Sequence, residues 1–283
     1  MSKHERIKDA AFKIAVDLLD SGNATGLRSY LRDNPDIVRR RVAFDGDNYF
    51  TRPTLLEFVA ENPTRHGTLP QNIVEIAKII LDTGGRDDRS SVDAALPLVS
   101  SSSVARTSGA QLPLIDLLCR YGADPKAGIY SALLYGEFES VNALLALGAK
   151  MDLVVAAAMG RYDDANARLS AANDETRQKA LALAAQYGHL EIVRLLLGAG
   201  VDPNRYSPPG FHSHATPLHQ AALAGHDRVV RLLVESGARV DIQDIHYNAT
   251  ALGWAEHSGH TEIAAYLRSP ARGAGSPAHD EHG

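Results

Sequence analysis

Four histidines lie close together between residues 205 and 226, in the segment RYSPPGFHSHATPLHQAALAGH. His212 and His214 are two residues apart, so on an extended strand their rings would point to the same side. Zinc needs three or four ligands in a tetrahedral array, and His246 or His257 could add to the pair. The spacing fixes no third ligand. It therefore leaves a metal site, a polar-aromatic contact loop and a solvent-exposed loop as alternatives, of which we expect the contact loop.

A second set of residues contains the groups that general acid–base catalysis uses. These residues are Asp45, Asp47, Glu57, Glu61 and His66. Catalysis would require them to meet at one substrate atom, and solvated loop charges are the simpler interpretation. The chain has no phosphate-binding glycine loop, no nucleophile elbow and no His-Glu-x-x-His motif. We therefore expect no catalytic residues, no metal and no cofactor.

Three long loops keep an alternative function open. Segments 41–53, 61–71 and 205–214 combine polar and aromatic residues between apolar runs. If these loops met, the pocket between them would suit an enzyme or a protein that binds a small ligand or a metal. An enclosed pocket with a perturbed histidine or carboxylate would favour that alternative over a simple contact surface.

Composition excludes several classes of function. Of the 283 residues 45% are hydrophobic but only 6% are aromatic, which favours helices packed through alanine and leucine. A net charge of −5 without a basic stripe argues against nucleic acid as a partner. The charged N-terminus and the lack of a long apolar run predict neither a signal peptide nor a membrane span. The single cysteine, Cys119, cannot form an internal disulfide, and we expect a cytoplasmic protein.

The elements that must position these side chains follow from an internal repeat. The segment ATPLHQAALAGHDRVVRLLVESGARVD (215–241) aligns with ATALGWAEHSGHTEIAAYLRS (249–269) at a shift of 34 residues. Upstream, KALALAAQYGHLEIVRLLLGAGVDPN (179–204) aligns with the same template at a shift of 37. Repeats of this length indicate a stack of similar units, each of which buries its apolar face against its neighbours.

This pattern resembles the ankyrin repeat, with its Thr-Pro-Leu-His start, paired alanines, Gly-His turn, paired leucines and closing Gly-Ala. The matching residues are Thr216, Pro217, Leu218, His219, Ala221, Ala222, Gly225, His226, Leu232, Leu233, Gly237 and Ala238. The last repeat departs from it, because Ala251 replaces proline and Gly253 replaces histidine. That repeat looks like a terminal cap. With its long loops, the chain as a whole resembles bacterial ankyrin-repeat proteins.

Each signature position has a physical reason. Thr216 can cap a helix and Pro217 presets the backbone angle of the first helical position. Gly225 can end that helix in a left-handed conformation. The resemblance implies that His219 ties neighbouring repeats together by hydrogen bonds. We therefore expect structural roles for the histidines at signature positions: His189, His219, His226 and His260.

The predicted fold is an all-α ankyrin-repeat solenoid of about seven helix–turn–helix units, with occasional β-hairpin or long-loop insertions. We expect one solenoid over residues 1–269 and a disordered tail over 270–283. The approximate units are 8–40, 53–85, 92–127, 128–152, 153–177, 178–214, 215–248 and, as the cap, 249–269. The serine-rich stretch 92–109 must supply a first helix but fits the template poorly.

The resemblance implies a non-catalytic protein–protein interaction module that binds a protein partner on its concave face and hairpin tips. The candidates in the first loop are Asp47, Asn48, Tyr49, Phe50 and Arg52. Those on the concave face are Tyr135, Gln186, Tyr187, Leu223, Trp254 and His257, and those in the loop before the Thr-Pro-Leu-His motif are Phe211, His212 and His214. We expect a monomer that binds a protein of unknown identity, without nucleic acid or membrane.

Overall fold

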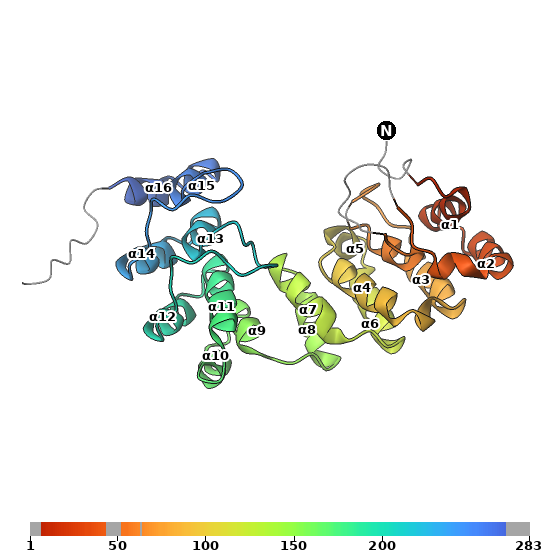
Figure 1. Ribbon diagram of the computed structural model, residues 1–283, viewed down its shortest axis with the longest axis horizontal. Coiled ribbons are helices and arrows are strands. Elements are labelled where there is room, and N and C mark those ends of the chain that lie inside the picture. The colour runs from red at the N-terminus through yellow and green to blue at the C-terminus, as the bar shows by residue number, and fades with distance from the viewer. Residues whose placement is uncertain (1–6, 44–51, 63, 270–283) are drawn as a thin grey trace, which may run out of the picture. The chain divides into compact units, whose positions relative to one another are not determined.

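The computed structural model describes residues 7–43, 52–62 and 64–269 (Figure 1). The described residues form helices joined by turns and loops, without a strand, and an isolated antiparallel bridge joins Gln243 to Thr250. The prediction of an all-α fold of helix–turn–helix units is therefore confirmed. Contacts divide the chain into two compact units, Met1–Lys150 (unit 1) and Met151–Gly283 (unit 2).

Unit 1 is a stack of helical hairpins. Their first helices are α1 (Ala10–Asp20), η3 (Leu55–Ala60), α4 (Arg89–Ser100) and α7 (Pro125–Leu134). Their second helices are α2 (Ala24–Asp33), α3 (Ile73–Asp82), α6 (Gln111–Arg120) and α8 (Phe138–Ala146). Helix α4 packs between η3 and α7, and α6 packs between α3 and α8. Short helical turns complete the unit: η2 (Pro35–Arg39), η4 (Gly85–Asp87) and α5 (Ser103–Thr107).

Unit 2 repeats the same arrangement. Its first helices are α9 (Leu153–Ala158), α11 (Asp174–Gln186), α13 (Pro217–Leu223) and α15 (Ala251–His257). Its second helices are α10 (Tyr162–Leu169), α12 (Leu190–Gly198), α14 (Asp227–Glu235) and α16 (Thr261–Arg268). Figure 1 shows α9, α11, α13 and α15 following one another, and each packs against the next. One apolar cluster includes residues from every helix of the unit.

Small residues let the first helices approach closely. All six residues of α9, LVVAAA, are buried, and α11 buries a run of alanine and leucine from Ala180 to Ala185. Helix α13 begins with Pro217 after Thr216, whose side chain and backbone form a capping box with His219. The buried alanines and leucines of α9 and α11 agree with the alanine-and-leucine packing that the composition indicates.

Histidines tie consecutive hairpins of unit 2 together. The Nε2 atoms of His189, His226 and His260 lie 2.9–3.0 Å from the carbonyl oxygens of Ala158, Gln186 and Leu223 in the preceding hairpin. Because all three acceptors are the last residues of first helices, each bond supplies a partner for a carbonyl group at a helix end. His219 also reaches the next hairpin, with Nε2 3.2 Å from the Ala249 carbonyl. The structural roles expected for these four histidines are therefore confirmed.

Each imidazole lies against a glycine of the preceding hairpin. Gly160, Gly188 and Gly225 have positive φ, and a Cβ atom at any of them would lie 2.6–2.7 Å from a ring atom of the next histidine. Glycine is therefore needed at these turns for two reasons: it adopts the left-handed backbone conformation, and it leaves the space that the histidine ring occupies.

The serine-rich stretch forms a long first helix followed by a helical turn. Helix α4 ends at Ser100, and the Ser102 hydroxyl then accepts the Ala105 N–H at 3.0 Å to cap α5. The same hydroxyl donates to the Ala60 carbonyl of the preceding hairpin at 2.6 Å. Gly128 lets α7 approach α4, since a Cβ there would lie 2.6 Å from the Ser100 hydroxyl. In this repeat, buried serines therefore take the place of the Thr-Pro-Leu-His signature.

Candidate partner-binding surface

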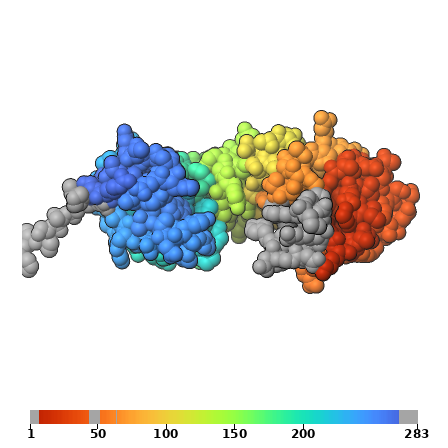
Figure 2. Space-filling view, turned by 90° about the horizontal axis from the view of Figure 1, so that it is seen from above, coloured from red at the N-terminus to blue at the C-terminus, as the bar shows by residue number. Residues whose placement is uncertain are grey.

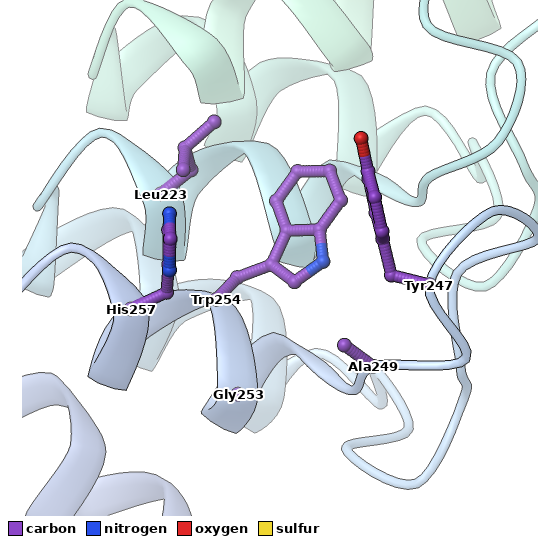
Figure 3. Close-up of a pocket in the computed structure, with 6 residues that line it drawn as sticks. All are labelled: Leu223, Tyr247, Ala249, Gly253, Trp254 and His257. Atoms are coloured by element: carbon purple, nitrogen blue, oxygen red, sulfur yellow. The ribbon is translucent and has the colours of Figure 1, made fainter.

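An apolar pocket opens beside α13 and α15 in unit 2. It has a volume of about 580 Å³ and is lined by Leu223, Tyr247, Ala249, Gly253, Trp254 and His257. Figure 3 shows the Trp254 indole with Tyr247 on one side and with Leu223 and His257 on the other. Tyr247 is 77% exposed and Leu223 is 42% exposed. In Figure 2 the last hairpins of unit 2, coloured blue, face solvent over a broad area. Large apolar side chains are thus presented to solvent around one hollow.

Asp244 fixes the hairpin that carries Tyr247. Its side chain is buried, and its Oδ1 accepts the backbone N–H groups of His246 at 2.9 Å and Tyr247 at 2.7 Å. Its Oδ2 accepts the Ala249 N–H at 3.1 Å and the Trp254 indole N–H at 3.0 Å. Burial alone would raise the pKa of Asp244, but these hydrogen bonds outweigh it and lower the pKa to about 2. The carboxylate is therefore ionised at neutral pH and holds the indole in place.

Histidine rings pack against the same indole. The His214 ring is stacked on His246 with centroids 4.6 Å apart and lies 5.8 Å from the Trp254 ring. The His219 ring meets Trp254 edge-on at 5.2 Å. Burial lowers the pKa values of His214 and His219, so both rings are neutral at pH 7. His214 therefore supports the pocket wall through Trp254.

The loop before α13 differs from its prediction. Phe211 is 5% exposed, and the Lys179 ammonium lies 5.0 Å from the centre of its ring. Phe211 is thus a core residue that anchors the loop and does not offer its ring to a partner. His212 has φ of 55°, so the backbone is not extended at this residue, and its ring meets His214 edge-to-face at 6.2 Å. Phe211 is buried because the loop folds back onto α11, whereas Tyr206 of the same loop is 40% exposed.

Gln186 and Tyr187 lie at the end of α11, one hairpin before Leu223. The Gln186 side chain donates to the Tyr187 hydroxyl at 3.2 Å, and the Gln186 carbonyl accepts from His226. Tyr187 is half-buried, and its ring lies 6.5 Å from His189. The predicted residues Gln186, Tyr187, Leu223 and His257 therefore occupy equivalent helix ends in successive hairpins.

Tyr135 follows α7 in unit 1 and is 67% exposed. It lies beside a polar pocket of about 250 Å³, which is lined by Glu61, Asn62, Thr64, Ser101, Ser102, Ser103, Val104, Arg106, Tyr135 and Glu137. Arg106 and Glu137 form an ion pair there at 2.9 Å. Tyr135 therefore belongs to a polar surface of unit 1, whereas the aromatic pocket belongs to unit 2.

The first predicted contact loop lies mostly outside the described residues, and this applies to Asp47, Asn48, Tyr49 and Phe50. Arg52 is described, is exposed and has φ of 67°. The two ends of the loop lie side by side, since the Val42 N–H donates to the Pro53 carbonyl at 3.2 Å.

Among the described residues of the acid–base set, Glu61 and His66 lie together, and Glu57 does not join them. Asp45 lies outside the described residues, and Glu57 caps its own helix by accepting the Thr54 N–H at 3.0 Å. Burial raises the pKa of Glu57. Glu61 is buried and accepts the backbone N–H groups of Arg65, His66 and Gly67. The two glutamates therefore shape separate turns.

Glu61, His66 and Asp20 are the one group of three described His, Cys, Asp or Glu residues whose ligand atoms lie within 4.8 Å of one another. Arg65 Nη2 already lies 2.8 Å from Asp20 Oδ1 and 3.2 Å from Glu61 Oε1. The guanidinium also lies over the Phe58 ring at 4.8 Å. The guanidinium thus pairs with both carboxylates within the chain, and the cluster serves as a brace for the loop that begins at Glu61.

Comparison with known families now decides the identity of the fold. A family model described as ankyrin repeats, in three copies, matches residues 103–244 and 181–275, which together are more than half of the chain. The chain belongs to the ankyrin-repeat family. The hairpins of unit 2 are therefore ankyrin repeats, and the aromatic pocket lies in the last two of them. None of the helices in the described part of this ankyrin-repeat protein is long and apolar enough to cross a membrane.

Named relatives share parts of the chain. The human cyclin-dependent kinase inhibitor 2A is 32% identical over 127 residues, which cover 43% of this chain and 78% of that protein. The bovine cyclin-dependent kinase 4 inhibitor B is 30% identical over 128 residues, which cover 44% of this chain and 95% of that protein. Mouse ankyrin repeat and SAM domain-containing protein 6 is 37% identical over 95 residues, 34% of this chain and only 10% of that protein. These relatives are mammalian, so they do not support a specific resemblance to bacterial proteins.

Asp244 and Tyr247 were not among the predicted site residues. Both lie in the hairpin before α15, and hairpin tips were expected to contact partners. The tip segment DIHYN contains an aspartate with backbone N–H groups two and three residues later, which is the spacing of an Asx turn. That signal could have identified the hairpin, but not the bond from Asp244 to Trp254.

Proposed function

We propose that this ankyrin-repeat chain is a non-catalytic protein–protein interaction module and that the aromatic pocket of unit 2 is the centre of its contact surface. The observation that carries this proposal is the exposure of Tyr247 and Leu223 around the half-buried Trp254. Large aromatic and apolar side chains that line a hollow bury much area when a partner fills it. Their positions at helix ends and a hairpin tip agree with the contact positions that the family resemblance implies.

The groups around the pocket support rigid presentation of this surface. Asp244 holds Trp254 and the Tyr247 backbone by charged hydrogen bonds, and His214 and His219 pack against the indole. A surface that is already ordered loses less entropy when a partner binds. Tyr187 and Gln186 extend the same row of helix ends by one repeat, and we include them in the contact surface.

The proposal is tested in two steps. The partner is first isolated by affinity purification on the full chain from its native host, and its affinity is then measured with purified components. Two relatives are named as inhibitors of cyclin-dependent kinases, so protein kinases are one class to examine in the eluate.

The decisive variants are Leu223→Asp and its matched control Leu112→Asp. Leu223 is 42% exposed at the pocket, whereas Leu112 is 40% exposed on α6 in unit 1. We expect Leu223→Asp to weaken binding at least about ten-fold, because a charge would have to be buried in an apolar contact. Leu112→Asp should leave the affinity unchanged. Equal affinities of the wild type and Leu223→Asp would reject the pocket as the contact surface.

We also propose that the chain acts as a monomer in the cytoplasm and does not bind nucleic acid. The net charge of −5 and the single, half-buried Cys119 support this. Burial raises the pKa of the Cys119 thiol to about 11, so this cysteine is a poor nucleophile at neutral pH.

A further inference from the structure

The aromatic pocket is backed by a negative charge that has no cationic partner. Asp244 is ionised, and all four of its described hydrogen bonds come from neutral N–H groups. Among the residues that the structure describes, no lysine or arginine lies within ion-pair distance of Asp244, although the chain forms many ion pairs elsewhere. The N–H dipoles stabilise the carboxylate without cancelling its charge. Its field therefore reaches the pocket through the indole to which it is bonded.

The indole is placed to use that charge. Its N–H donates to Asp244 at 3.0 Å, and this bond shifts electron density toward the ring, whose face lines the pocket. A cation over the face of tryptophan or tyrosine is attracted by the negative face of the ring. Tyr247 supplies a second aromatic wall (Figure 3). The pocket thus combines two electron-rich rings with a nearby fixed carboxylate.

Other rings of this chain already hold such cations. Arg231 lies 4.3 Å from the centre of the Tyr266 ring, and Arg65 lies 4.8 Å from that of Phe58. Within the described part of the chain, no cation lies over Trp254 or Tyr247, whose ring neighbours are histidines. These two faces are therefore available to a cation from another molecule.

The chemistry of the lining selects between the possible cations. Each oxygen of Asp244 already accepts two N–H groups, and the lining is mainly apolar. A primary ammonium would lose tightly bound water there without gaining acceptors. A guanidinium is planar and weakly hydrated, and it can stack by its face while its N–H edges stay in contact with solvent at the pocket mouth.

We propose that this pocket takes an arginine side chain of the protein partner, with the guanidinium over the Trp254 indole and beside the Tyr247 ring. The proposal rests on the proposed function, because it names the chemistry of the partner segment that fills the same surface. The net charge of −5 on the chain favours such a basic segment over long range.

The test uses Trp254 as its own reporter, since it is the only tryptophan of the chain. The full-length protein is titrated with N-acetyl-arginine methylamide and, in parallel, with the citrulline analogue, which has the same shape but no charge. Ionic strength is held constant. We expect the arginine probe to change Trp254 emission with a dissociation constant in the millimolar range. The citrulline probe should bind at least about five-fold more weakly than the arginine probe. Equal affinities, or no response to arginine up to about 50 mM, would overturn the proposal.

A pair of variants locates the effect. Tyr247→Leu keeps the wall apolar but removes the ring, and Tyr162→Leu changes an exposed tyrosine on α10. We expect Tyr247→Leu to weaken the arginine probe about three-fold and Tyr162→Leu to leave it unchanged. The shift of the single indole N–H resonance in a nitrogen–proton NMR spectrum provides a second measurement. An unchanged affinity of Tyr247→Leu would reject the tyrosine wall.

Failure here can be told apart from failure of the proposed function. If arginine and citrulline bind alike but Leu223→Asp still abolishes partner binding, the proposed contact surface is retained and the proposal of an arginine ligand is rejected. If Leu223→Asp leaves the partner's affinity unchanged, the proposed contact surface is rejected, whatever the affinities of the arginine and citrulline probes.

Discussion

Asp244 links the stability of the last repeat to the shape of the proposed contact surface. Its carboxylate closes the turn before α15 through three backbone N–H groups and fixes the only tryptophan through a fourth bond. A buried carboxylate is costly unless such donors surround it. The low pKa of Asp244, about 2, follows from these donors and not from any nearby cation.

The first prediction compares two aspartates of the same hairpin. Asp244→Ala leaves the Trp254 indole and three backbone N–H groups without their acceptor, so we expect it to lower the free energy of unfolding by about 2 kcal/mol or more. Asp241→Ala removes an exposed carboxylate that pairs with Arg239 on the surface, and we expect no measurable change. Urea unfolding followed by Trp254 fluorescence measures both. Equal midpoints for the two variants would contradict the role of Asp244.

The second prediction concerns pH and the buried histidines. Burial lowers the pKa values of His189, His214 and His219 below the ordinary value of 6.5 for histidine. The unfolded chain therefore binds protons first as the pH falls, so the stability that these neutral rings provide is complete above pH 6.5 and is lost below it. Aspartates with lowered pKa values lose their contribution to stability only below the ordinary aspartate pKa of 3.8.

We therefore expect the urea midpoint of unit 2, followed by Trp254 fluorescence, to be lower at pH 5.5 than at pH 7.5. His189→Gln, which keeps a polar side chain without a titrating ring, should reduce the difference between the two midpoints. A midpoint that stays constant or rises on acidification would show that the histidines are not buried in neutral form.

At the scale of the element, a turn glycine and the histidine of the following repeat act together. The glycine ends a first helix in the left-handed region, and the space above its Cα holds the imidazole that bonds to that helix end. Two requirements that are separate in the sequence, one for glycine and one for histidine, thus become one contact. The second helices α12, α14 and α16 begin directly after these histidines, and they also pack through apolar core residues such as Val193, Val230 and Ile263.

The third prediction separates backbone strain from this contact. Gly188 has φ of +73°, and a Cβ there would lie 2.6 Å from the His226 ring, whereas Gly200 has φ of +80° with open space around it. We expect Gly200→Ala to cost about 1 kcal/mol from the left-handed backbone alone. Gly188→Ala should cost roughly 2–3 kcal/mol, because the ring must also move. Thermal or urea unfolding gives the difference, and equal losses would mean that the ring yields without cost.

At the scale of the molecule, each repeat contacts mainly the repeats before and after it. Stability in such an array is a sum of local terms and nearest-neighbour terms. A binding surface that extends over several repeats can therefore be changed in one repeat while the other repeats keep their structure. The apolar cluster of unit 2 illustrates this, because it is continuous from Leu153 to Leu267 yet each helix meets few partners.

The fourth prediction tests this locality with Asp244→Ala. Hydrogen exchange measured by mass spectrometry should increase over α13–α16 and remain unchanged over α1–α8, because the perturbation passes only through successive interfaces. The wild-type protein under the same conditions is the reference. A uniform increase over the whole chain would show that the repeats unfold as one cooperative unit.

Much of the fold could be predicted from the sequence because the signature positions have local causes. Thr216 and Pro217 start a helix by capping and by a preset φ, and Gly225 ends it, so these residues can be interpreted without knowledge of their neighbours. The same logic assigned His189 and His226 to the scaffold and removed them from the candidate site. The stretch 92–109 was harder, because its serines work by bonding across repeats, as Ser102 does to Ala60.

The amino-acid sequence by itself determined the helical repeat, its phase and the rows of positions that we propose as partner contacts, since all of these depend on spacing along the chain. Only the tertiary structure decided which of the candidate side chains are available. It buried Phe211 under Lys179, and it joined Asp244 to Trp254, which lies ten residues away. The physical reason is that exposure and charge at a site depend on which groups fold back onto it, and neighbouring residues in the sequence do not specify those contacts.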